Sequence, residues 1–118
     1  MAAFVKNVKA EGGNLDTFAA YGFESVLAFR DAANAAVAKD GVNGLTRANL
    51  INGIKSLTDF NADGMAGTRS YKNGQITGCF VVVRFLKGKW VRQYPTKKGT
   101  FDCKASNLTA IKANLTGG

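Results

Sequence analysis

The sequence predicts a mixed α/β chain in which helices come first and a β-hairpin follows. Three observations indicate this class. Apolar residues recur at helical spacing as far as residue 57, the pattern then changes to that of extended strands, and a Lys-Gly pair separates two β-rich runs. With 118 residues, of which 46% are hydrophobic, the chain has the length and composition of one modest globular domain.

Three helices are expected in the first half. A short one covers residues 4–10. A longer one starts near Asp16 or Thr17, whose side chains can accept hydrogen bonds from the first turn, and runs to about Lys39. The third follows Thr46, a good N-cap residue. Its apolar stripe consists of Leu50, Ile51, Ile54 and Leu57. A polar, flexible stretch is expected from residue 58 to residue 67.

The second half predicts a β-hairpin. Residues 79–86 and 90–94 are rich in β-branched and aromatic side chains, and Lys87-Gly88 forms a two-residue turn in which the glycine can take a positive φ. A two-stranded hairpin is too small to cover the apolar face of a long helix. The helices therefore imply a sheet that this sequence does not contain, supplied either by a partner chain or by a longer protein.

Composition disfavours an enzyme. The absence of histidine removes the commonest general base and the commonest zinc ligand, and the eight acidic residues show no metal-binding spacing. No catalytic residue, metal ion or cofactor is therefore predicted. No apolar run approaches the ~20 residues of a membrane-spanning helix, and the first residues do not resemble a signal peptide.

Positive charge is concentrated in the second half. Residues 1–66 hold six Lys/Arg against seven acids, whereas residues 67–118 hold ten against Asp102 alone. Basic and aromatic side chains interleaved in this way can line a groove for single-stranded nucleic acid. The residues concerned are Arg84, Lys87, Lys89, Arg92, Lys97 and Lys98, with Trp90, Tyr94 and Phe101. A solvated strand face protected by lysines is the favoured alternative.

Five short motifs occur in order along the chain. They are residues 22–25 (Gly-Phe-Glu-Ser), 45–50 (Leu-Thr-Arg-Ala-Asn-Leu), 67–74 (Gly-Thr-Arg-Ser-Tyr-Lys-Asn-Gly), 88–91 (Gly-Lys-Trp-Val) and 94–103 (Tyr-Pro-Thr-Lys-Lys-Gly-Thr-Phe-Asp-Cys). Their order resembles the C-terminal segment of type I periplasmic binding proteins of the branched-chain amino-acid group, which are solute receptors of ABC transporters. Phe23 and Glu24 replace the Tyr-Asp that is usual in the family, and the family's larger part is missing.

The resemblance implies a partial type I periplasmic-binding-protein fold, with helices that cover a parallel sheet and then a β-hairpin. Residues 1–66 would be the helical part of a Rossmann-like lobe, and residues 67–118 the basic hairpin and tail of the hinge or crossover region. The whole would be a fragment of a longer periplasmic, extracellular or cell-surface protein. That protein would capture an amino acid or similar small molecule and pass it to an ABC permease.

The resemblance also nominates individual residues. Tyr21, Phe23 and Glu24 would contact the ligand, because the matching motif opens a helix near the cleft. Core packing is the favoured role for Phe23, and the helix dipole alone favours an acid such as Glu24 near a helix start. The resemblance and the placement of the cysteines at a strand end favour a disulfide between Cys79 and Cys103 over two separate buried thiols.

Self-association is a further alternative. Uncovered helix faces can pair between chains, so the isolated chain would form a homodimer or larger homo-oligomer and serve as a structural module.

Overall fold

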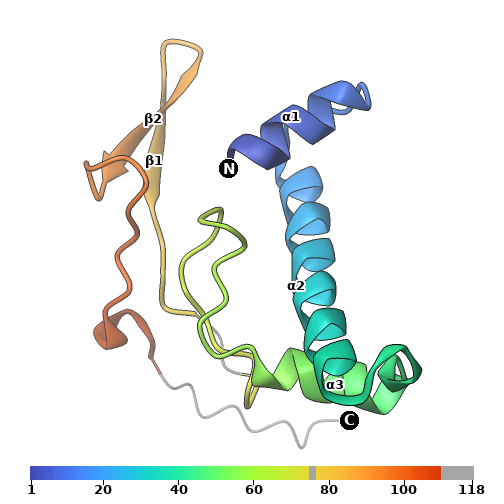
Figure 1. Ribbon diagram of the computed structural model, residues 1–118. Coiled ribbons are helices and arrows are strands. Elements are labelled where there is room, and N and C mark those ends of the chain that lie inside the picture. Colours follow the sequence, from blue (N-terminus) through green and yellow to red (C-terminus); the bar gives the residue numbers. More distant parts are fainter. Residues whose placement is uncertain (75–76, 110–118) are drawn as a thin grey trace, which may run out of the picture. The chain divides into compact units, whose positions relative to one another are not determined.

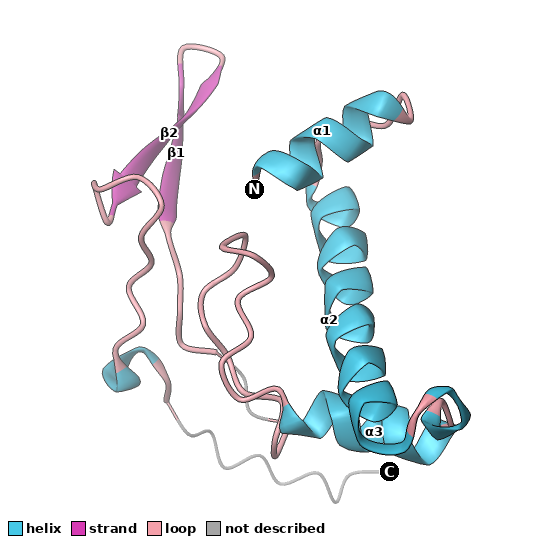
Figure 2. Cartoon of the chain, viewed as in Figure 1, coloured by secondary structure: helices cyan, strands magenta, loops and turns pink. Residues whose placement is uncertain are grey.

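The computed structural model describes residues 1–74 and 77–109 of the 118-residue chain. The chain forms two compact units, the helical unit (Met1–Thr77) and the hairpin unit (Gly78–Gly118). The described part combines α-helices and short 3₁₀ turns with a two-stranded antiparallel sheet (Figure 2). The mixed helix-and-sheet class is therefore confirmed, and within these residues the only sheet is this antiparallel pair.

The helical unit is organised around one long helix. Helix α1 (Ala2–Ala10) lies near the start of α2 (Thr17–Asp40), and α3 (Arg47–Ser56) lies near its end (Figure 1). The predicted start of α2 is confirmed, because the Asp16 carboxylate accepts a hydrogen bond of 2.8 Å from the backbone N–H of Ala19. Phe4 of α1 is buried, and this anchors the short helix to the unit.

Helix α3 (Arg47–Ser56) begins as predicted at Thr46, whose hydroxyl accepts a hydrogen bond from the backbone N–H of Asn49 at 3.2 Å. The Asn49 side chain does not complete the cap. Its amide donates instead to the Asp40 carboxylate at 3.1 Å and to the Gly44 carbonyl at 3.0 Å. The start of α3 is thereby joined to the end of α2 and to the 3₁₀ turn Val42–Gly44.

A close approach of backbones sets the packing of α3 on α2. A Cβ atom placed on Gly53 would lie 2.6 Å from the carbonyl oxygen of Ala32, well inside contact distance. Ala32 is completely buried, and the small neighbouring Ala36 is nearly so. Small residues on both helices therefore let the two backbones meet without an intervening layer of side chains.

The segment after α3 folds back over α2 and supplies part of the core. Leu27 and Ala28 of α2 pack against Phe60 and Ala62. Phe60 and Arg69 exchange backbone hydrogen bonds of 3.0 and 2.9 Å, which close the segment into a loop. The expectation of a polar, flexible stretch from residue 58 to residue 67 is wrong here, because two of its apolar residues are buried.

A second side of α2 is left uncovered. Phe18, which is 85% exposed, and Phe29, which is 55% exposed, lie on one side of the helix because eleven residues make about three turns. Tyr21 and Val26 flank them and are also exposed. Helix α2 is thus apolar on two sides, one packed against its own unit and one facing solvent.

The hairpin unit contains β1 (Val82–Leu86) and β2 (Lys89–Tyr94), paired antiparallel with an irregularity between Val82 and Val83. The predicted two-residue turn is confirmed. Lys87 and Gly88 both take positive φ, 48° and 78°, as the tightest hairpin turns require.

Strand β1 starts three residues later than the predicted 79–86. Upstream of it, Phe80 exchanges backbone hydrogen bonds of 3.0 and 3.1 Å with Asp102 instead of continuing the pairing with β2. The chain beyond the hairpin therefore returns to run beside the entry of β1.

Candidate functional site

The three residues predicted to contact a ligand lie in the first turns of α2, and they face different directions. Tyr21 and Glu24, three residues apart, lie on neighbouring faces of the helix, whereas Phe23 points to another side. Tyr21 is 62% exposed on the uncovered face. Phe23 packs edge-on against Phe4, with ring centroids 5.6 Å apart. The helical unit by itself therefore does not gather the three side chains around one cavity.

Glu24 is engaged by an arginine that the sequence patterns did not single out. Its Oε1 lies 2.7 Å from Nη2 of Arg69, and the two side chains are 12% and 24% exposed. The backbone bridge between Phe60 and Arg69 brings this guanidinium to α2. This ion pair is largely shielded from water, and it links the segment after α3 to α2.

The Glu24–Arg69 pair retains one unused polar atom. Nε of Arg69 is buried and has no hydrogen-bond partner. An unsatisfied buried donor costs stability, so this nitrogen is available to an acceptor that reaches it. Only the opposite charges could have suggested the pair in the sequence, because 45 residues of chain separate the two side chains and no periodic pattern links them.

Hollows indent the described part of the helical unit, and neither of the two best defined combines the nominated residues. An open, apolar hollow of about 330 Å³ lies between α1 and α2 and is lined by Asn7, Val8, Glu11, Gly13 and Phe23. A smaller hollow of about 170 Å³ lies between α2 and α3 and is lined by Ala35, Ala36, Lys39, Asp40, Asn49, Asn52, Gly53 and Ser56. Phe23 is the nominated residue that reaches one of them.

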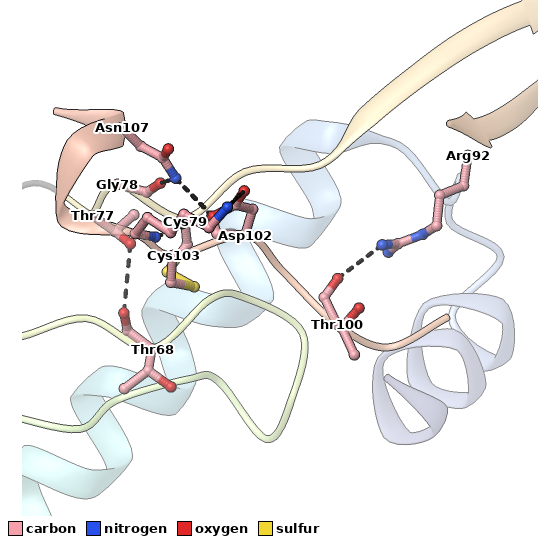
Figure 3. Close-up of a disulfide and its surroundings, with 10 residues drawn as sticks. Thr68, Thr77, Gly78, Cys79, Arg92, Thr100, Asp102, Cys103 and Asn107 are labelled. Atoms are coloured by element: carbon pink, nitrogen blue, oxygen red, sulfur yellow. Dashed lines mark hydrogen bonds and ion pairs between the residues drawn. A yellow bond between two sulfur atoms is a disulfide. The ribbon is translucent and has the colours of Figure 1, made fainter. Parts of the chain in front are cut away.

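In the hairpin unit, Cys79 and Cys103 form a disulfide, as expected (Figure 3). The bond lies beside the Phe80–Asp102 bridge, so a covalent link and two backbone hydrogen bonds join the same two chain segments. The amide of Asn107 adds further hydrogen bonds by donating to the Gly78 carbonyl at 3.0 Å and to the Asp102 carboxylate at 3.1 Å. These bonds fasten the base of the hairpin unit.

Asp102 accepts several of the hydrogen bonds at the base of the hairpin unit. Its carboxylate is buried and accepts hydrogen bonds from the Tyr94 hydroxyl at 2.6 Å and from the backbone N–H of Lys104 at 3.2 Å. The Tyr94 hydroxyl, the Asn107 amide and the Lys104 N–H stabilise the charged form and lower the pKa of Asp102 to about 2. The same carboxylate raises the pKa of the Tyr94 hydroxyl above its usual 10, because it holds the phenolic proton.

The basic side chains of the hairpin unit divide into two kinds. Arg92 is committed to structure, because its Nη1 donates to the carbonyls of Pro95 and Thr100 at 3.1 and 2.8 Å. Among residues 78–109 the others are exposed: Arg84, Lys87, Lys89, Lys97, Lys98 and Lys104. Of these, Lys104 forms an ion pair, its Nζ lying 3.6 Å from Oδ2 of Asp102. Trp90, at 71% exposure, stands among the cations near the turn, whereas Phe101 is half-buried.

Among residues 1–74 and 77–109, no three His, Cys, Asp or Glu side chains converge as metal ligands would. No helix in the same residues has the length and hydropathy needed to cross a bilayer. No protein-family model, curated protein or solved structure matches the chain.

Proposed function

We propose that this chain is the C-terminal part of an extracytoplasmic solute receptor of the type I periplasmic-binding-protein fold, which captures an amino acid or similar small molecule for an ABC importer. The receptor would close two lobes around its ligand, so that affinity arises from contacts that both lobes make in the closed state. The chain would contribute helices of one lobe and a hairpin near the hinge, and it would have no catalytic role.

The observation that carries the proposal is the uncovered face of α2. A helix with apolar side chains on two sides belongs between two layers. One layer is the segment that carries Phe60 and Ala62. The other side presents Phe18, Tyr21 and Phe29 to solvent, and it has the character of a helix face that covers a sheet in an α/β lobe. A parallel sheet of a Rossmann-like lobe would meet this requirement.

The disulfide supports the proposed compartment. Bonds such as Cys79–Cys103 persist in oxidising surroundings and are rare where cytosolic thiols keep cysteines reduced. An exported receptor folds in such surroundings. The cysteine-containing motif at residues 94–103 is also one of the five on which the family resemblance rests.

Of the nominated ligand contacts, Tyr21 fits the proposal best. Its ring is exposed at the edge of the uncovered face, where it flanks Phe18 and Phe29 near the start of α2. Glu24 would act on the ligand indirectly, because its carboxylate is already paired with Arg69. Phe23 would serve the packing of α1 on α2.

Calorimetry tests the proposal. The reading frame around this chain is expressed at its natural extent and titrated with a panel of amino acids, beside the 118-residue chain alone. The longer protein should bind at least one of them with a Kd on the order of 1 µM, about −8 kcal/mol, and the isolated chain should give no saturable heat. Micromolar binding by the isolated monomer, a reading frame that is no longer than 118 codons, or a longer protein that binds none of the panel contradicts it.

A further inference from the structure

The end of the hairpin carries an exposed group of apolar side chains. This hairpin tip, residues 83–91, has Phe85 paired with Trp90 on one face, with ring centroids 5.0 Å apart. The rings are 57% and 71% exposed. Leu86 and Val91 lie on the opposite face, because side chains alternate along a strand, and they are also exposed. The tip therefore exposes apolar side chains on both of its faces.

Cations accompany this apolar group: Arg84 and Lys89 lie on the face of Leu86 and Val91, and Lys87 lies in the turn. Arg84, Lys87 and Lys89 belong to the tip and are exposed. Residues 78–109 hold seven Lys/Arg against the single acid Asp102. The Asp102 carboxylate is buried at the base of the unit, where Tyr94 and other donors bind it. The tip thus presents positive charge at the turn and on the face of Leu86 and Val91, and exposed aromatic rings on the other face. This combination matches an anionic partner with an apolar component.

Two features favour a lipid surface over a nucleic acid. A single strand laid on a sheet uses the stacking surfaces of one face, whereas the apolar residues here occupy both faces. Trp with Lys and Arg is also the combination that membrane–water interfaces favour, because the ring sits at headgroup depth while the charged ends reach phosphates.

We propose that the hairpin tip docks on an anionic lipid surface, with Phe85 and Trp90 placed among the headgroups and Arg84, Lys87 and Lys89 against lipid phosphates. This partner goes beyond solute capture. The tip makes these contacts with its own exposed side chains, so the docking does not require a bound solute.

Trp90 is the only tryptophan, so its fluorescence reports on the tip alone. The 118-residue chain is titrated with vesicles of phosphatidylcholine containing phosphatidylglycerol, and with vesicles of phosphatidylcholine only. Anionic vesicles should shift the emission to shorter wavelength and protect Trp90 from acrylamide, and added salt should reverse both effects. Neutral vesicles should leave the emission nearly unchanged.

Variants locate the contact. Lys87→Ala combined with Lys89→Ala should lower the partition coefficient by roughly thirtyfold, since each cation near an anionic surface contributes about 1 kcal/mol, or about fivefold. Lys97→Ala combined with Lys98→Ala removes the same charge outside the tip and should lower it by about threefold or less. Phe85→Ser keeps the fluorophore and should lower it by about tenfold. An intact disulfide by non-reducing mass analysis and an unchanged circular dichroism spectrum establish that each variant is folded.

Three outcomes overturn the proposal. One is an emission that anionic vesicles leave unchanged. Another is an equal loss of partitioning for the two lysine pairs. The third is a shift that a single-stranded oligonucleotide produces and that vesicles neither produce nor compete for, which would assign the tip to nucleic acid. None of these results changes the calorimetric test of solute binding, so the two proposals fail independently.

Discussion

Substituting alanine for two helical glycines should change the stability of the chain in opposite directions. In a helix, Gly→Ala stabilises by about 1 kcal/mol through backbone conformation alone. At Gly22 of α2 the new methyl group meets no atom within 4 Å, so this gain is expected in full. At Gly53 of α3 it meets the carbonyl oxygen, Cα and carbonyl carbon of Ala32 at 2.6, 3.0 and 3.1 Å.

The contacts at Gly53 involve backbone atoms of a completely buried residue, which cannot rotate away. Overpacking of this kind costs about 3 kcal/mol at the upper end of its usual range. Gly53→Ala should therefore be less stable than the parent by about 2 kcal/mol, and Gly22→Ala more stable by about 1 kcal/mol. Thermal unfolding followed at 222 nm should separate the two variants by on the order of 10–20 °C. If Gly53→Ala were as stable as Gly22→Ala, the close contact of α3 with α2 would be wrong.

Three further measurements examine the core, the disulfide and the buried carboxylate. Leu27→Ala should lower the free energy of unfolding by about 3 kcal/mol, whereas Phe18→Ser on the uncovered face should change it by less than about 0.5 kcal/mol; equal losses in urea titrations would contradict the exposure of that face. Reducing the Cys79–Cys103 bond, which closes a separation of 24 residues, should cost the hairpin unit about 3 kcal/mol. Amide exchange should then accelerate in β1 and β2 but not in α2, and acceleration of both would show that the units unfold together. Asp102, with its pKa lowered from 3.8 to about 2, contributes stability that is present above pH 4 and is lost as the pH falls through 2; a carbon-detected NMR titration giving a midpoint near 4 would contradict its hydrogen bonds.

The helices and the hairpin turn were predictable because their signals are local. Asp16 and Thr46 cap helices through hydrogen bonds to N–H groups three residues away. The Lys87-Gly88 turn requires positive φ at adjacent residues, for which a glycine is a strong sign. Such signals depend on a few neighbouring residues, and a single sequence contains all of them.

Contacts between distant segments were not predictable in the same way. The Phe60–Arg69 and Phe80–Asp102 bridges join irregular segments that have no hydrophobic period to follow. The partner of Glu24 was missed for this reason, because Arg69 reaches it only after the chain has turned back over α2. The acidic side chain near a helix start was visible in the sequence, but its ion pair depends on tertiary packing.

Helix α2 links the packing of the chain to its proposed function. The side of α2 that carries Leu27 is covered by the segment after α3, and Ala32 is covered by α3 itself. The helix is therefore packed against two parts of its own unit. The aromatic residues Phe18 and Phe29 lie on the side of the helix opposite Leu27 and are exposed. An exposed apolar face stabilises a protein only when another layer covers it. Gly22 lies on the same face of the helix as Phe18. A covering sheet in the longer receptor would therefore meet the methyl group of Gly22→Ala, and this substitution would stabilise the isolated chain but destabilise the whole protein.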